Sequence, residues 1–310
     1  MADRISLVTG GAGFIGSHIA AAISARDGRV RVADNLSTGY RHNLEAIPNV
    51  EFLEGDLADA SFAARAVEGV GVVYHQAAIP SVPRSVKDPA TSHRANVDAS
   101  LNVLLAAREA GVRRVVYAAS SSAYGDTPVL PKREDMPPNP RSPYALQKLV
   151  AEQYCTLFTR LYGLETVSIR YFNVFGPRQD PTSAYSGVIS QFAQALTEGR
   201  SPTIYGDGRQ TRDFTYIDNV VDGVLRAAEA PEASGEVINV ATGGRVSLLD
   251  LFDAMKRLTG AGVEPVFAAP RAGDVRDSQA DISKARRLLG YEPRVSFEEG
   301  LARTVAWYRG

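Results

Sequence analysis

The sequence predicts a doubly wound α/β fold, in which helices cover both faces of a parallel sheet, followed by a smaller C-terminal α/β domain. Two observations support this prediction. In the first 170 residues, short β-rich runs alternate with longer helical patterns, which is the order of βαβ units. After Arg170 the alternation loosens, and prolines and glycines crowd residues 175–187 and 199–208.

The expected strands are short runs rich in apolar and β-branched residues. In chain order they cover Ile5–Val8, Arg29–Ala33, Val50–Leu53, Val70–His75, Arg114–Ala118 and Glu165–Arg170. Longer stretches with a helical pattern separate them, and these are Gly16–Ala25, Phe62–Val67, Asn96–Ala110 and Ala145–Tyr162. The strands are expected to be parallel, because each helix returns the chain to the same edge of the sheet.

The second half contains fewer regular elements. We expect a strand over Glu236–Val240 and a helix over Leu248–Leu258. The chain is expected to return once to the sheet, so that residues 1–170 with about 213–240 form the large domain. Residues 171–212 with about 241–310 then form the smaller domain.

Composition excludes several classes of protein. An apolar fraction of 45% excludes a disordered chain, and a net charge of −1 offers no overall field to nucleic acid or a membrane surface. Cys155 is the only cysteine, so a disulfide framework and a cysteine-rich zinc site are excluded, and we expect no metal. No apolar run approaches the ~20 residues that cross a bilayer, and no signal peptide fits before Ile5. We therefore expect a cytoplasmic protein.

A glycine-rich turn follows the first expected strand and opens the first helix. It reads Thr9-Gly10-Gly11-Ala12-Gly13-Phe14-Ile15-Gly16. Such glycines allow a tight turn, a close approach of the backbone to a pyrophosphate and close packing of helix on strand, with the phosphates at the positive end of the helix. We interpret the turn as a dinucleotide site, and an incidental turn is the alternative. Its expected cofactor residues are Gly10, Gly13, Phe14, Ile15 and Gly16.

Two carboxylates follow the next strands. Asp34 ends the second strand, where a carboxylate accepts hydrogen bonds from the ribose hydroxyls of NAD and repels the 2′-phosphate of NADP. Arg31 and Arg41 lie nearby in the sequence, so NADP stays open as an alternative cofactor. Asp56-Leu57 after the third strand suits the edge of the adenine. A cap or turn at Asp34 and a strand-end turn at Asp56 are the alternatives.

A tyrosine and a lysine share one face of an expected helix. Tyr144 and Lys148 are spaced i, i+4, which places both side chains on that face. A phenol titrates near ~10, and a nearby ammonium and the positive nicotinamide ring both lower this pKa toward the range of a general base. Ser120–Ser122 follow the fifth strand, at the edge where doubly wound sheets bind ligands. A polar cap is the alternative for these serines.

Six segments form a recognisable set. They are TGGAGFIG at Thr9–Gly16, Asp34-Asn35, HQAA at His75–Ala78, SSSAYGD at Ser120–Asp126, SPYALQK at Ser142–Lys148 and RYFNVFGPRQDP at Arg170–Pro181. This set resembles the extended short-chain dehydrogenases and, among them, the nucleotide-sugar 4-epimerases, over Ile5 to Trp307. The resemblance implies a Rossmann domain that holds NAD tightly and a second domain that binds a UDP-sugar.

The resemblance also implies roles for single residues. Ser120 matches the catalytic serine or threonine, Tyr144 the base and Lys148 its partner. Tyr144 would take the proton of the 4-hydroxyl while hydride passes from C4 to NAD⁺, and the 4-ketose would turn over before hydride returns to its other face. Asn96 matches an asparagine near the active site, and a satisfied helix residue is the alternative. The cofactor residues would further include Asn35, Ala77, Asn96, Tyr144 and Lys148.

Substrate residues are implied in the same way. The positions of Asn173, Arg212 and Arg271 meet the diphosphate, which suits arginine forks, and that of Asp274 meets the uridine ribose. Ser278 matches a position beside the sugar C2 substituent, where a small residue admits an acetamido group and a tyrosine excludes it. The expected substrate residues are Ser121, Ser122, Asn173, Tyr205, Arg212, Arg271, Asp274 and Ser278.

The sequence therefore predicts an enzyme that interconverts UDP-N-acetylglucosamine with UDP-N-acetylgalactosamine, and UDP-glucose with UDP-galactose. Related dehydratases carry an Asp-Glu pair where Ser121 and Ser122 stand, and uronate epimerases carry threonine in place of Asn173. A UDP-glucuronate 4-epimerase, another dehydratase or decarboxylase, and a non-catalytic NAD-binding module stay open as alternatives. Family members pair through two helices, so we expect a homodimer formed by Asn96–Ala110 and Ala145–Tyr162, and packing of these faces on the sheet is the alternative.

Overall fold

A seven-stranded sheet forms the centre of the molecule. The computed structural model describes residues 5–26, 28–181, 187–270 and 275–310. Every neighbouring pair of strands in the sheet is parallel, in the order β11-β6-β5-β4-β1-β2-β3, which confirms the predicted fold class. The strands are β1 (Ile5–Thr9), β2 (Val30–Asp34), β3 (Val50–Glu54), β4 (Val70–His75), β5 (Arg114–Ser120), β6 (Glu165–Tyr171) and β11 (Val237–Val240). The strand order reverses between β1 and β4, and doubly wound sheets bind ligands outside the carboxyl ends at such a point.

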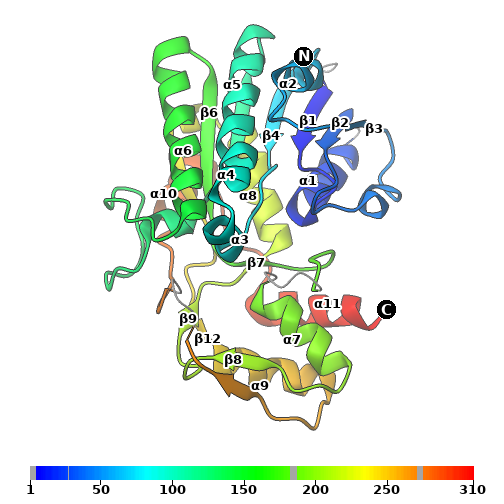
Figure 1. Cartoon of the computed structure of the whole chain (residues 1–310), viewed down its shortest axis with the longest axis vertical. Coiled ribbons are helices and arrows are strands. Elements are labelled where there is room, and N and C mark those ends of the chain that lie inside the picture. Colours follow the sequence, from blue (N-terminus) through cyan, green and yellow to red (C-terminus); the bar gives the residue numbers. More distant parts are fainter. Residues whose placement is uncertain (1–4, 27, 182–186, 271–274) are drawn as a thin grey trace.

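Helices cover both faces of this sheet (Figure 1). One face carries α2 (Ala60–Val67), α5 (Ala99–Glu109) and α6 (Pro143–Tyr162), and the other carries α1 (Phe14–Ser24) and α8 (Ile217–Glu229). The helices within each layer contact one another: α2 and α6 both contact α5, and α1 contacts α8.

Strand β5 shows how one run of sequence serves two cores. Val115, Tyr117 and Ala119 are buried in the core beneath α5 and α6, whereas Val116 is buried in the core beneath α1 and α8. Successive side chains of a strand point to opposite faces, so a strand covered on both sides is apolar throughout rather than alternating.

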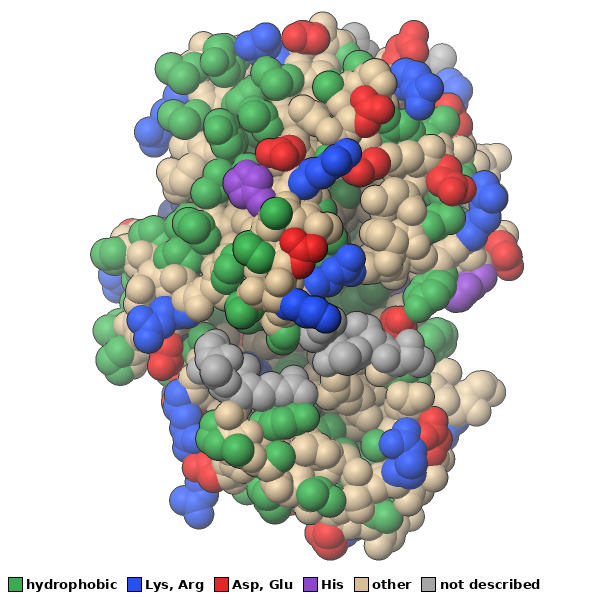
Figure 2. Space-filling model, viewed as in Figure 1, with side chains coloured by type: hydrophobic (Ala, Val, Ile, Leu, Met, Phe, Trp, Pro, Cys, Tyr) green, Lys and Arg blue, Asp and Glu red, His purple; other side chains and the backbone are tan. Residues whose placement is uncertain are grey.

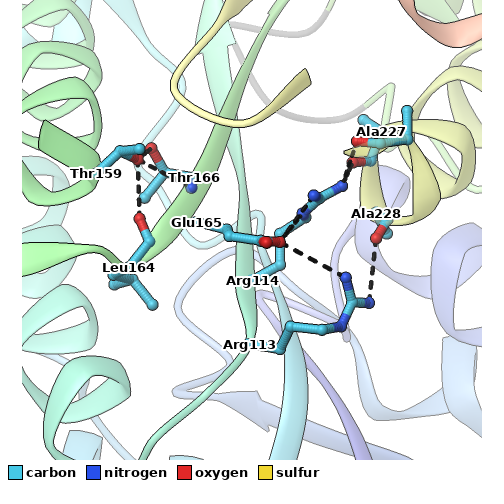
Figure 3. Close-up of polar contacts among 9 residues, drawn as sticks. Arg113, Arg114, Thr159, Leu164, Glu165, Thr166, Ala227 and Ala228 are labelled. Carbon is cyan, nitrogen blue, oxygen red and sulfur yellow. Dashed lines mark hydrogen bonds and ion pairs between the residues drawn. The ribbon is translucent and has the colours of Figure 1, made fainter. Parts of the chain in front are cut away.

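Arg114 fastens α8 to the amino end of the sheet (Figure 3). Its Nε donates to Glu165 Oε2 at 2.8 Å, and its Nη1 donates to the carbonyl oxygens of Ala227 at 3.0 Å and Ala230 at 2.6 Å. These carbonyls lie at the C-terminal end of α8, where a cation also meets the negative end of the helix dipole. These bonds fix the C-terminal end of α8 at the amino edge of the sheet, opposite to the carboxyl edge where ligands are expected.

A smaller part lies beyond the carboxyl edge of the sheet (Figure 1). Its helices α7 (Val188–Thr197), α9 (Leu248–Thr259) and α11 (Phe297–Arg309) contact one another. Three pairs of short strands complete it: β8 (Thr203–Tyr205) with β13 (Val266–Ala268), β9 (Thr211–Arg212) with β12 (Val246–Ser247), and β7 (Val174–Phe175) with β10 (Thr215–Tyr216). Its apolar core is continuous with the core beneath α1 and α8, which holds the two parts together.

The chain returns to the sheet twice, where the sequence predicted one return. The first return is α8 with β11, and the second is α10 (Ser283–Leu289), which packs on both of them. Helix α10 is short, so its sequence gives no clear signal, and its position on the sheet follows only from its contacts with β11 and α8. The domain limits themselves stay a prediction.

The first residues of the helix expected over Asn96–Ala110 are not α-helical. Residues Arg94–Asp98 form a π-helix, and α5 follows it directly. A π-helical turn often lies at a functional site. Two short helices precede it, α3 (Val82–Lys87) and α4 (Pro89–His93). Elsewhere in the chain, 3-10 turns cover Arg41–Leu44, Ser121–Tyr124 and Pro231–Ala233.

Within the described residues, none of the helices combines the length and apolarity needed to span a bilayer.

Candidate active site

A cavity of about 1200 Å³ lies at the carboxyl edge of the sheet, between the large and the smaller part. Figure 2 shows the surface hollowed between these two parts. A cavity of this size accommodates ligands considerably larger than one sugar. The predicted site residues that line it are Gly10, Gly13, Phe14, Ile15, Gly16, Asp34, Asn35, Asp56, Leu57, Ala77, Ser120, Ser121, Ser122, Tyr144, Lys148, Asn173, Arg212 and Ser278.

The glycine turn leaves no room for a side chain at Gly10 or Gly16. Gly10 has a φ of +64°, and a Cβ there would lie 2.7 Å from the backbone of Ala77. A Cβ on Gly16 would lie 2.2 Å from the carbonyl oxygen of Gly10. These contacts bring strand, turn and helix α1 together with the helix amino end facing the cavity, as a pyrophosphate requires.

Asp34 is held at the end of β2 by two backbone donors. Its Oδ2 accepts from Ala12 N at 2.9 Å and its Oδ1 from Leu36 N at 2.8 Å. Burial raises the pKa of this carboxyl group, and the backbone hydrogen bonds oppose that shift. Each carboxylate oxygen retains a lone pair for a ribose hydroxyl. The glycine turn and this carboxylate together fit NAD.

Tyr144 lies in the first turn of α6, opposite the end of β5. Ser142 caps this helix, accepting from Ala145 N at 3.2 Å, and Tyr144 N donates to Ser85 Oγ at 3.0 Å. Burial raises the pKa of the Tyr144 phenol, and a hydrogen bond with Ser120 opposes the rise. For the protein alone, this is opposite to the lowering that the sequence predicted, because spacing does not reveal how deeply the phenol is buried.

Lys148 lies one turn further along α6 and is 4% exposed. Its Nζ is 4.4 Å from the centre of the Tyr117 ring. Burial lowers the pKa of Lys148 to about 7, with opposing effects from Cys155 and Glu152. Burial thus disfavours the charged form of Lys148 and weakens the positive charge that this lysine offers to the phenol.

Asn96 is placed behind the wall of the cavity rather than in its lining. It is 1% exposed, its Oδ1 accepts from Ile79 N at 2.8 Å, and its Nδ2 donates to Gln147 Oε1 at 2.9 Å. Ile79 itself lines the cavity, so Asn96 positions that segment. This arrangement is the satisfied helix residue that the sequence left as an alternative.

Three expected substrate residues come together at the other end of the cavity. Asn173 Nδ2 donates to the carbonyl oxygen of Asp213 at 3.3 Å, Arg212 Nη1 donates to the carbonyl oxygen of Arg276 at 3.1 Å, and Ser278 N donates to that of Thr211 at 3.1 Å. Tyr205 does not belong to the lining. The expected residues Arg271 and Asp274 lie outside the described residues.

Asp213 is a residue that the sequence analysis missed. It is fully buried, and its carboxylate accepts from the Thr242 and Gly243 amides, the Thr242 hydroxyl and Ala280 N, at 2.6–3.1 Å. It thereby fixes the segment after Ser278 beside Arg212. Its position next to Arg212 in the sequence was a signal, but its partners are distant along the chain.

Comparison with known proteins shows which family the chain is similar to. The family that matches the chain is the NAD dependent epimerase/dehydratase family, over residues 6–241. A protein named UDP-glucose 4-epimerase from Mycolicibacterium smegmatis is 42% identical over 309 residues, which cover 98% of each chain.

Two solved structures are similar to the chain along nearly its whole length. The UDP-glucose 4-epimerase of Thermotoga maritima with UDP-glucose has a TM-score of 0.95 and 40% identity, over 98% of both chains. The UDP-N-acetylglucosamine 4-epimerase of Methanobrevibacter ruminantium in complex with UDP-N-acetylmuramic acid has a TM-score of 0.94 and 39% identity, over 99% of both chains.

Proposed function

The chain belongs to the NAD dependent epimerase/dehydratase family, and on that basis we propose that it inverts C4 of UDP-linked hexoses. One observation carries the proposal. Ser120, Tyr144 and Lys148 line a cavity that begins at the NAD-binding turn and extends to Arg212 and Ser278. In this arrangement we expect a sugar whose diphosphate is held by Arg212 to place its ring beside Tyr144.

In this mechanism Tyr144 moves the proton and Ser120 holds the oxygen. NAD, when bound, supplies the acceptor and donor of hydride. Tyr144 takes the proton of the 4-hydroxyl and later returns it to the same oxygen. Ser120 Oγ accepts from Ser122 Oγ at 2.8 Å and from Ser122 N at 3.2 Å, so its own hydrogen is directed away from Ser122. In the protein alone this hydrogen is available to the Tyr144 oxygen, and with substrate bound it would turn to the substrate oxygen.

Ser121 and Ser122 favour epimerisation over loss of water. Both line the cavity, and neither hydroxyl is an acid or base comparable to the Asp-Glu pair of the dehydratases that the chain resembles. Asn173, in place of the threonine of uronate epimerases, favours neutral sugars.

We further propose that N-acetylated sugars are substrates. Ser278 lines the cavity and is small, so it leaves room beside the C2 substituent. One similar structure is named a UDP-N-acetylglucosamine 4-epimerase and another a UDP-glucose 4-epimerase, which supports acceptance of both sugar classes. The expected reactions are UDP-N-acetylglucosamine to UDP-N-acetylgalactosamine and UDP-glucose to UDP-galactose.

The test is incubation of the purified protein with UDP-glucose, UDP-N-acetylglucosamine and UDP-glucuronate in separate reactions, followed by chromatographic separation of products. Ser278→Tyr should lower kcat/KM for the N-acetylated sugar by about 10-fold or more relative to UDP-glucose, because overfilling a fitted pocket is costly. Ser278→Ala is the control and should keep the ratio. An unchanged ratio in Ser278→Tyr, or wild-type protein that ignores N-acetylated sugars, contradicts the proposed substrate range.

We also propose a homodimer through α5 and α6. Leu146, Leu157 and Leu161 of α6 are 51%, 45% and 66% exposed, so this helix presents an apolar surface of the kind that marks protein contacts. Light scattering should give twice the chain mass at micromolar concentration. A monomer mass would contradict the proposal.

A further inference from the structure

Lys132 places a buried ammonium group in the wall of the cavity, outside the catalytic set. The residue is 2% exposed and lines the cavity together with Gly125 and Ser278. It lines the same cavity as Ser120 and Ser122, where the sugar is expected.

The backbone of Lys132 is fixed beside the segment that carries Ser278. Lys132 N donates to the carbonyl oxygen of Gln279 at 2.7 Å, and its carbonyl oxygen accepts from Asp281 N at 2.9 Å and from Asn239 Nδ2 at 3.0 Å. These three bonds hold the lysine next to the wall that Ser278 forms.

The ammonium is only partly used by the protein. Its Nζ donates to the carbonyl oxygen of Thr127, and within the described part of the chain it forms no ion pair. Burial lowers the pKa of Lys132, while the charges of Asp126 and Asp277 oppose this shift. Asp277 is itself engaged, since the amide and the hydroxyl of Thr211 both donate to it.

An ammonium has three donors, so within the described ranges two remain unused after the bond to Thr127. Burial of a charged group with so few acceptors costs free energy, and an apolar side chain of similar length would fill the same space. The retained charge therefore indicates a role in binding rather than in packing.

We propose that Lys132 is a specificity-determining residue that donates a hydrogen bond to the carbonyl oxygen of the C2 acetamido group. The inference rests on the proposed function, in which Ser278 faces that substituent. A hydrogen bond from a charged donor to an amide oxygen is strong, whereas the C2 hydroxyl of UDP-glucose carries no such carbonyl oxygen.

The experiment compares kcat/KM for UDP-N-acetylglucosamine, UDP-glucose and UDP-glucuronate in wild type and Lys132→Met. The methionine variant should lose about 10- to 100-fold on the N-acetylated sugar and less than about 3-fold on UDP-glucose. Lys284→Met is the matched control, because Lys284 pairs with Glu236 and does not line the cavity. Lys132→Leu, which also removes the donor, replaces the methionine variant with the same expected losses if that variant does not fold.

Three outcomes overturn the inference. Equal losses on UDP-N-acetylglucosamine and UDP-glucose would show that Lys132 only shapes the loop through Thr127. A loss confined to UDP-glucuronate would assign the ammonium to a sugar carboxylate. Wild-type protein that is inactive on UDP-N-acetylglucosamine would contradict the proposed substrate range as well, and the wild-type assay alone distinguishes that failure from the other two.

Discussion

Glu152 and Arg170 form a buried ion pair behind the catalytic face of α6. Arg170 Nε and Nη2 donate to Glu152 Oε2 and Oε1 at 2.8 and 2.7 Å, and the two side chains are 4% and 1% exposed. The guanidinium lies 4.5 Å from the centre of the Tyr124 ring, and its Nη1 has no hydrogen-bond partner among the described residues. The pair links α6 to β6 one helical turn beyond Lys148.

Removal of one member should lower the free energy of unfolding by about 3–5 kcal/mol, because it leaves the other charge buried and unpaired. Glu152→Leu and Arg170→Met are the single variants. The double variant removes both charges and should lose less than either single variant, since most of the cost in each single variant is the uncompensated charge. Arg276 and Asp207 provide a control with a similar two-bond geometry at 2.9 Å, but both side chains are about half exposed. Arg276→Met should therefore change stability little.

Urea unfolding followed by circular dichroism, with NAD at the same saturating concentration in every sample, measures these differences. If the losses of the two single variants add up in the double variant, the two charges do not act as a coupled pair. Equal effects of Arg276→Met and Arg170→Met would refute the role assigned to burial.

Three further variants test the cofactor site and the burial of Lys148. Asp34→Ala should weaken NAD and relax discrimination against NADP in a fluorescence titration, and a wild-type preference for NADP would show that the carboxylate was misinterpreted. Gly16→Ala should be purified with much less NAD than wild type, because its Cβ would lie 2.2 Å from Gly10 O, whereas Gly262→Ala meets nothing within 4 Å and should retain its NAD. Burial lowers the pKa of Lys148 from 10.5 to about 7, so between these values the unfolded chain binds more protons and stability rises with pH. Lys148→Met should remove this part of the rise from urea midpoints measured between pH 7 and pH 9, and an unchanged pH dependence would count against it.

The sheet and the reactive pair could be predicted because their signals are local. The alternation of strands and helices gives the parallel sheet, and the spacing of Tyr144 and Lys148 gives a shared helix face. The glycine turn is a similar case, since Gly10 and Gly16 are required by contacts within a few residues and with the neighbouring strand end.

The remaining features depend on contacts between distant parts of the chain. Asp213 binds Thr242 and Ala280, and Lys132 is fixed by Gln279; no spacing in the sequence reveals such pairs. Asn96 was expected among the cofactor residues, but its side chain accepts from Ile79 N behind the cavity wall. The direction of a pKa shift likewise follows from burial, which the order of residues does not contain.

Turnover of Tyr144→Phe tests most directly whether Tyr144 is the acid–base group of a C4 epimerisation. Wild-type protein should convert UDP-N-acetylglucosamine and UDP-glucose to their C4 epimers. The variant should bind both sugars, as followed by calorimetry, and be slower by about 10²-fold or more, because it lacks the group that transfers the proton. Near-normal turnover in Tyr144→Phe, or wild-type products that are not inverted at C4, would contradict the account.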